Sequence, residues 1–128
     1  MKKALGVMLL ILFACDFTED RSIIVNNKTD SPIYCLVTNS LIDNNSSKSD
    51  ICIEILSNDF GGINPVRTRW ESFIEKNKKK RIELYVFEKD TVEKYGWESS
   101  VIDERFSKKF LFTIADLDDI EWELNYFK

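Results

Sequence analysis

The segment from Ile82 to Phe87 constrains the fold most strongly, because it is apolar on both faces of an extended strand. Successive side chains of a strand point to opposite faces. Ile82, Leu84 and Val86 therefore share one face, whereas Tyr85 and Phe87 share the other. A strand that is apolar on both faces is normally covered on both. The sequence predicts that this strand is central and lies between two apolar layers.

Other segments carry the patterns of strands and short helices. The predicted strands span 22–26, 32–38, 51–56 and 120–126. Helices are predicted around 70–74, at 90–96, at 97–104 and from Thr113 onward. Asp90 with Glu93 resembles a capping box, and Thr113 with Asp116 begins a turn in the same way. The polar stretch 39–50 and the stretch 57–65 are predicted to be loops.

The chain has 128 residues, enough for one small domain, which we assign to residues 22–128. The strand pattern predicts a mainly β fold: a small antiparallel β-sandwich of immunoglobulin-like character with short helical connections. The alternative is an α+β fold, in which helices cover one face of an open antiparallel sheet. The feature that discriminates between them is whether residues 97–106 pack over the sheet or lie at its edge.

Residues 1–15 predict export and lipid attachment. Two lysines precede the apolar stretch 4–14, which is too short to span a membrane but has the length of a signal-peptide core. It ends in Leu12-Phe13-Ala14-Cys15, which resembles a bacterial lipobox. The resemblance implies a lipoprotein signal peptide over 1–14. It also implies acyl chains, such as palmitate, on Cys15. The acidic residues that follow predict that 15–21 is the lipidated cysteine and an acidic tether.

The predicted mature chain is acidic. Two of the 18 basic residues lie in the signal peptide, so 16 basic and 22 acidic residues remain, for a net charge of −6. Such a surface repels nucleic acid, and we expect no nucleic-acid partner. The expected location is the cell envelope, on a bacterial membrane through the lipid on Cys15. The residues around Cys15 leave the choice of inner or outer membrane open.

Cys35 and Cys52 lie in the predicted strands on either side of the loop 39–50. If these strands pair as a hairpin, positions 35 and 52 lie opposite each other, and an oxidising compartment favours a disulfide. Two buried thiols that act as small apolar groups are the equal alternative. Neither interpretation is catalytic, because no CxxC motif or neighbouring base accompanies them.

The chain has no histidine, which removes Ser-His, Cys-His and zinc-histidine mechanisms. Glu71 and Glu75 are better explained as a solvated helix face than as paired catalytic carboxylates. Asp116, Asp118 and Asp119 lack the spacing and the glycine of a calcium loop. We therefore expect no enzyme, no cofactor and no metal site.

Three further features have both a functional and a structural interpretation. The basic run 76–81 suits lipid phosphates or a solvated junction. Trp70, Trp97 and Trp122 suit carbohydrate stacking, but their apolar periodic positions favour core packing. Residues 90–92 resemble an acceptor motif for O-glycosylation in Bacteroidetes, which competes with the capping role of Asp90.

Two stretches near the C-terminus resemble a known group of proteins. Residues 90–98 (DTVEKYGWE) and 112–117 (FTIADL), followed by the alternation over 120–126, resemble a pattern of small Bacteroidetes envelope lipoproteins whose function is unknown. The resemblance also covers the lipobox and the first two predicted strands. It implies an envelope location and a strand-helix-strand ending. It carries over no activity and no catalytic residue.

Three functional hypotheses follow. The first is a non-catalytic, membrane-anchored interaction or accessory module with a protein partner. The second is a periplasmic immunity or inhibitor protein that neutralises a toxin or a hydrolase, since a net charge of −6 suits a basic partner. The third is a glycan hydrolase based on two carboxylates, which needs a cleft where they converge.

Overall fold

The computed structural model describes residues 21–38, 51–65, 69–76 and 79–128. The predictions for the signal peptide, for Cys15 and for the loop 39–50 lie outside these residues.

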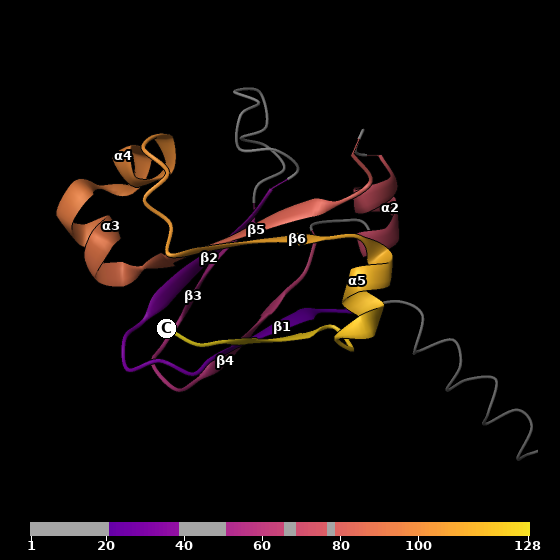
Figure 1. The fold of residues 1–128 in the computed structure, drawn as a ribbon, viewed down its shortest axis with the longest axis horizontal. Helices are drawn as coiled ribbons and strands as arrows, with labels where there is room; N and C mark the ends of the chain where they lie inside the picture. The colour runs from indigo at the N-terminus through magenta and orange to yellow at the C-terminus, as the bar shows by residue number, and fades with distance from the viewer. Residues whose placement is uncertain (1–20, 39–50, 66–68, 77–78) are drawn as a thin grey trace, which may run out of the picture.

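Four strands come first in the described chain, and short helices then lie between the later strands (Figure 1). The strands are β1 (Ile23–Asn27), β2 (Ile33–Thr38), β3 (Ile51–Ile55), β4 (Phe60–Ile63), β5 (Ile82–Glu88), β6 (Lys108–Phe112) and β7 (Glu123–Tyr126). The helices are α2 (Trp70–Glu75), α3 (Lys89–Tyr95), α4 (Trp97–Ile102) and α5 (Ile114–Asp119).

The strands form two sheets that pack face to face. One sheet has the order β4-β1-β7 and the other has the order β3-β2-β5-β6. Neighbouring strands are antiparallel, except that β7 runs parallel to β1. The predicted small, mainly β sandwich with short helical connections is confirmed.

The central position of β5 is also confirmed. It lies between β2 and β6, and its residues 82–87 are all buried. Ile82, Leu84 and Val86 belong to the core between the two sheets, where Val25 and Leu117 are also buried. The opposite face of β5 belongs to a second cluster outside the sandwich.

Helices α3 and α4 cover that outer face of the second sheet. Val101 and Phe106 pack against Leu36, Tyr85 and Phe87 there. Residues 97–106 thus lie over a sheet, the arrangement considered for the α+β alternative. The sheet β4-β1-β7, on the other side of the main core, makes the fold a sandwich.

Two predicted helix starts had different outcomes. At α5, the amide of Asp116 donates to the Thr113 hydroxyl and the amide of Thr113 donates to the Asp116 carboxylate, so this capping box is confirmed. The capping role of Asp90 is wrong. Strand β5 continues to Glu88, and α3 begins at the next residue with Glu88 as its N-cap. Asp90 therefore already lies in the first helical turn, where a carboxylate suits the helix dipole.

The stretch 57–65 is not wholly a loop, because it contains β4. Gly61 faces inward here: a Cβ atom on it would lie 2.9 Å from Cγ1 of Ile55 and 3.0 Å from Cδ1 of Ile53. Gly61 thus marks a close approach within a strand rather than a loop.

We expect Gly61→Ala to lower the free energy of unfolding by about 1–3 kcal/mol, the range for overpacking a core. The matched control is Gly62→Ala, because that Cβ would lie no closer than 3.4 Å to a neighbouring atom, the Cβ of Ser22. Its expected change is within about 0.5 kcal/mol. Urea denaturation of both variants measures the difference, and equal losses would contradict this packing.

Candidate interaction surface

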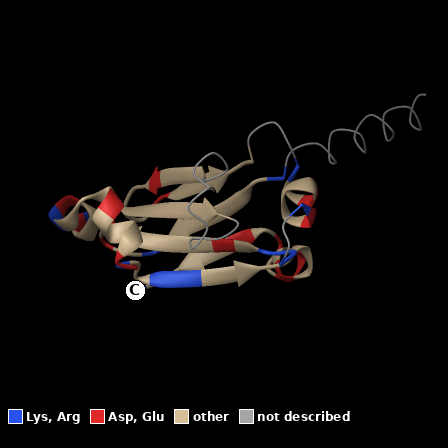
Figure 2. Ribbon diagram, turned by 90° about the horizontal axis from the view of Figure 1, so that it is seen from above, with Lys and Arg blue, Asp and Glu red and all other residues tan. Residues whose placement is uncertain are grey.

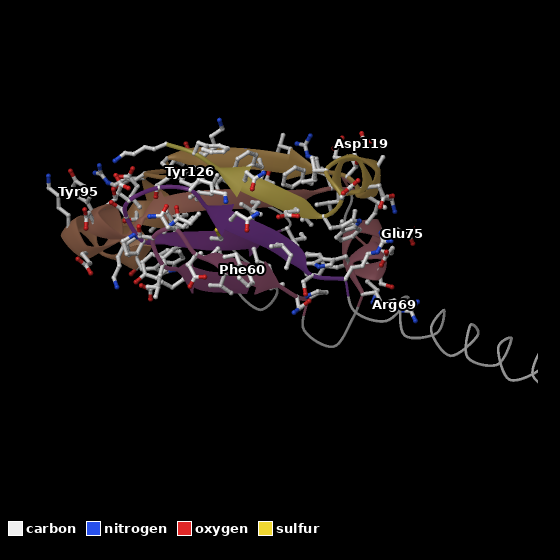
Figure 3. The ribbon with its side chains drawn as sticks, turned by 90° about the horizontal axis from the view of Figure 1, so that it is seen from below. Phe60, Arg69, Glu75, Tyr95, Asp119 and Tyr126 are labelled. Carbon is white, nitrogen blue, oxygen red and sulfur yellow. The ribbon has the colours of Figure 1, made fainter. Side chains whose placement is uncertain are left out.

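The amino end of β1 marks one end of the sandwich, which we call the α2–α5 end. The guanidinium of Arg21 pairs with Asp118 of α5 at 3.2 Å. The amide of Ile24 donates to the carbonyl of Trp122, which follows α5. Figure 3 places Arg69, Glu75 and Asp119 together at this end, with Tyr95 at the opposite one.

The carboxyl end of β1 marks the opposite end, the α3–α4 end. The amide of Lys28 donates to the carbonyl of Tyr126, at the end of β7. Lys128 pairs with Glu88, the N-cap residue of α3, at 3.2 Å. The last residues of the chain and the start of α3 therefore lie beside each other.

Exposed apolar side chains gather toward the α3–α4 end. Among the described residues, seven large apolar side chains are exposed, led by Ile102 at 69%, Phe60 at 67% and Phe127 at 65%. Three of them, Tyr95, Trp97 and Ile102, belong to α3 and α4. Three others lie near the carboxyl end of β1: Leu56, Phe60 and Phe127. Tyr95, Trp97 and Ile102 line one pocket, and grouped exposed apolar residues of this kind are typical of an interaction surface.

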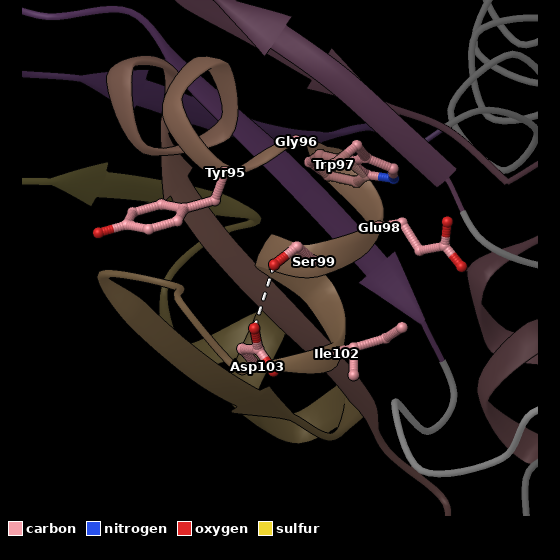
Figure 4. A pocket seen from close by; sticks show the side chains of 7 residues that line it. All are labelled: Tyr95, Gly96, Trp97, Glu98, Ser99, Ile102 and Asp103. Atoms are coloured by element: carbon pink, nitrogen blue, oxygen red, sulfur yellow. Dashed lines mark hydrogen bonds between the residues drawn. The ribbon is translucent and has the colours of Figure 1, made fainter.

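A shallow pocket of about 530 Å³ lies at the junction of α3 and α4 (Figure 4). It is lined by Tyr95, Gly96, Trp97, Glu98, Ser99, Ile102 and Asp103. Gly96 has φ 83° and ψ 156°, a backbone conformation that is essentially restricted to glycine. This residue sets the angle between the helices, and the predicted helix end at Gly96 is confirmed.

Trp97 is held at the pocket by two aromatic contacts. Its ring centroid lies 5.8 Å from that of Tyr34 and 5.2 Å from that of Phe87. Its exposed fraction is 37%, against 1% for Trp70 and 6% for Trp122. Core packing is therefore confirmed for Trp70 and Trp122. It is wrong for Trp97, because this ring lies outside the sandwich and is only partly covered.

The pocket has one carboxylate with partners and one without. Asp103 accepts a hydrogen bond from the Ser99 hydroxyl at 3.1 Å and pairs with Arg105 at 3.6 Å. The Arg105 guanidinium also lies 3.8 Å from the ring centroid of Tyr95. Glu98 is exposed and makes no ion pair with any residue that the structure describes.

Exposed acidic side chains are frequent on α3 and α4 and directly after them. Asp90, Glu93, Glu98 and Glu104 are all exposed, and within the described ranges none of them forms an ion pair. Figure 2 shows acidic positions on both α3 and α4. Lys94, on α3, is also exposed and forms none of the ion pairs of the described residues. The α3–α4 end therefore combines apolar area with an excess of unpaired negative charge.

The other acidic residues singled out in the sequence have structural roles or lie on the surface. Glu71 and Glu75 are exposed on α2. Asp116 caps α5, and Asp118 accepts a hydrogen bond from the Trp122 indole at 2.9 Å. In the part of the chain that the structure describes, no three histidine, cysteine or acidic residues are grouped to hold a metal ion.

Part of the basic run 76–81 is described. Lys76, Lys79 and Lys80 are exposed, and the Lys80 ammonium donates to the backbone carbonyl of Glu75 at the end of α2. Residues 77–78 lie outside the described ranges. The visible contact is that of a cation at a helix C-terminus.

The register around the cysteines differs by one residue from the predicted one. Cys52 lies opposite Leu36, and Cys35 lies opposite Ile53. Cys35 thus points into the main core, whereas Cys52 is exposed and points to the other face. Side chains that point to opposite faces do not have disulfide geometry, and no bond joins the two sulfur atoms. Of the two thiols, only Cys35 is buried as the alternative supposed.

The two thiols should differ sharply in reactivity. Burial, and to a smaller extent the neighbouring Cys52, raises the pKa of Cys35 to about 12, so this thiol stays protonated at pH 8. We expect iodoacetamide to modify Cys52 in the folded protein and both residues in urea, as measured by peptide mass spectrometry. Loss of both modifications unless a reductant is present would indicate a disulfide and contradict this arrangement.

A buried carboxylate was missed in the sequence. Glu83 of β5 is 4% exposed; it accepts a hydrogen bond from the Tyr85 hydroxyl at 2.8 Å and lies 3.7 Å from the Lys109 ammonium. Burial is the larger cause, and the hydrogen bond to Glu83 the next, of the raised pKa of Tyr85. The sequence feature that could have revealed Glu83 is a charged residue within an otherwise apolar strand. Its contacts explain how the charge is tolerated on the outer face of the sheet.

No protein-family model, curated protein or solved structure matches this chain. None of the described helices is long and apolar enough to cross a membrane.

Proposed function

We propose that the protein is a lipid-anchored lipoprotein of the bacterial cell envelope that acts as a non-catalytic interaction module. The lipobox ending at Cys15 and the resemblance to Bacteroidetes envelope lipoproteins support the anchor. The apolar and acidic α3–α4 end supports the binding of a protein partner. A domain that is anchored to the membrane and binds a partner at one end is suited to an accessory role beside that partner.

The observation that carries the proposal is the separation of the two ends. Arg21 lies six positions after Cys15, a span of at most about 20 Å of extended chain. The α2–α5 end, where Arg21 pairs with Asp118, is therefore close to the membrane in an anchored protein. The exposed apolar side chains lie mainly at the other end. The anchored domain presents that end to a partner.

Site-specific photocrosslinking in the native envelope tests the proposal. A photoreactive amino acid at Ile102, on α4, is expected to give a discrete adduct with one protein. The matched control is the same amino acid at Glu71, an exposed position on α2. Adduct from Ile102 alone supports binding at the α3–α4 end. No adduct, or equal adducts from both positions, contradicts it.

An immunity or inhibitor role is a second candidate, favoured by the unpaired carboxylates on α3 and α4. Acidic surfaces accelerate association with basic partners. This role predicts a tight one-to-one complex with a basic toxin or hydrolase, and protection of susceptible cells that express the protein. Cells that die at the same toxin dose with and without it would contradict this role.

A further inference from the structure

We infer that the pocket at the junction of α3 and α4 receives a lysine or arginine side chain of the protein partner. Glu98 binds the cation, and Trp97 and Ile102 contact its aliphatic stem. This inference deepens the proposed function and depends on its protein partner.

The three residues lie on one side of the pocket. Glu98 and Ile102 are four positions apart on α4, so they are neighbours on one helix face. Figure 4 shows their side chains on the same side of α4, with Trp97 beside Glu98. A carboxylate without an ion pair therefore lies next to exposed aliphatic and aromatic surface.

The other side of the same pocket already holds a cation in this way. The guanidinium of Arg105 lies 3.8 Å from the Tyr95 ring centroid and 3.6 Å from the Asp103 carboxylate. A basic side chain is thus bound between an aromatic ring and a carboxylate by the protein itself. Trp97 with Glu98 offers the same pair of groups without a cation.

The charge of the surroundings selects the occupant. An apolar side chain placed over Glu98 would remove water from an uncompensated carboxylate, which is costly. An anionic group would be repelled by Asp90, Glu93, Glu98 and Glu104, which have no ion pairs in the described part of the chain. These carboxylates outnumber Lys94, the cation that lies 5.1 Å from the Tyr95 ring centroid. Lysine and arginine combine an apolar stem with a charged head, which matches both parts of the pocket.

Tryptophan fluorescence reports on this pocket selectively, because Trp97 is 37% exposed whereas Trp70 and Trp122 are buried. The experiment uses the full chain in a nonionic detergent, with acrylamide as the quencher. The probe is a peptide of four Lys-Ala repeats, and the comparison peptide has glutamate in place of lysine. We expect the lysine peptide alone to protect the fluorescence, saturably and less at high salt.

Variants decide whether Glu98 carries the effect. Glu98→Gln is expected to weaken lysine-peptide binding about fivefold, the upper range for an exposed ion pair, and Glu98→Lys is expected to weaken it further. The matched control, Glu71→Gln on α2, is expected to leave binding unchanged. Trp97→Phe should remove the quenchable signal, which verifies the assignment of the probe.

Three results would overturn the inference: no protection by the lysine peptide, equal protection by the glutamate peptide, or equal weakening by Glu98→Gln and Glu71→Gln. Each concerns the pocket and not the anchor. The intact mass of the membrane-extracted protein tests the anchor separately, so the failure of one is distinguishable from the failure of the other.

Discussion

Replacing Phe87 with alanine is expected to lower the free energy of unfolding by about 3–5 kcal/mol, the range for deletion of a buried phenylalanine ring. Phe87 is fully buried on the outer face of β5. Its ring centroid lies 5.2 Å from that of Trp97 and 6.3 Å from that of Phe106. The substitution therefore removes one of the three buried side chains of the sheet, with Leu36 and Tyr85, on which α3 and α4 pack.

Urea denaturation with tryptophan fluorescence measures this loss. The matched control is Phe127→Ala, since Phe127 is 65% exposed and its truncation should change stability by less than about 0.5 kcal/mol. In the folded Phe87→Ala variant, Trp97 should also become more accessible to acrylamide. If the two variants lost the same stability, the packing of α3 and α4 on this sheet would be wrong.

Replacing Cys15 with serine is expected to abolish lipid attachment completely, because the thioether to the lipid forms on the cysteine sulfur. Metabolic labelling with a palmitate analogue measures the attachment, and the labelled band should disappear. The proposed anchor relies on two or three acyl chains, which bind a membrane stably where one chain does not.

The control for this variant is Cys52→Ser, which changes an exposed cysteine of β3 and should keep the full label. Label that persists in Cys15→Ser would place the lipid elsewhere. Label that is absent from the unchanged protein would remove the lipoprotein interpretation.

The strands that form the sandwich were largely predictable from local pattern. The predicted strand 82–87 and the observed β5 differ at one end only, because a strand that is apolar on both faces has no stable position except a central one. The strand β7 covers only residues 123–126 of the predicted 120–126. Glu121 and Trp122 have positive φ values of 57° and 61°, so the chain turns there after α5.

Pairing and exposure were not predictable from the same pattern. Strand β6 was not predicted, because the two lysines at its start interrupt the apolar pattern that indicates a strand. The one-residue error at the cysteines arose because symmetry about a loop does not determine register. In the structure, Ile53 and Ile55 face the core together with Cys35 and Ile33, and this side-chain alternation fixes the pairing.

The candidate surface depends on tertiary structure in a similar way. Trp97 occupies a position on an apolar periodic face in the sequence, yet the ring lies outside both sheets and stays partly exposed. Tyr95 and Ile102 give no distinct signal, since single apolar residues occur on most helix surfaces. The turn at Gly96, between α3 and α4, brings the three residues to one pocket.

The intact mass of the protein extracted from its native membrane tests the central claim most directly. The account predicts a chain of residues 15–128 that carries a lipid of two or three acyl chains on Cys15. The mass of an unlipidated chain would contradict the anchored lipoprotein, and with it the orientation that presents the α3–α4 end to a partner.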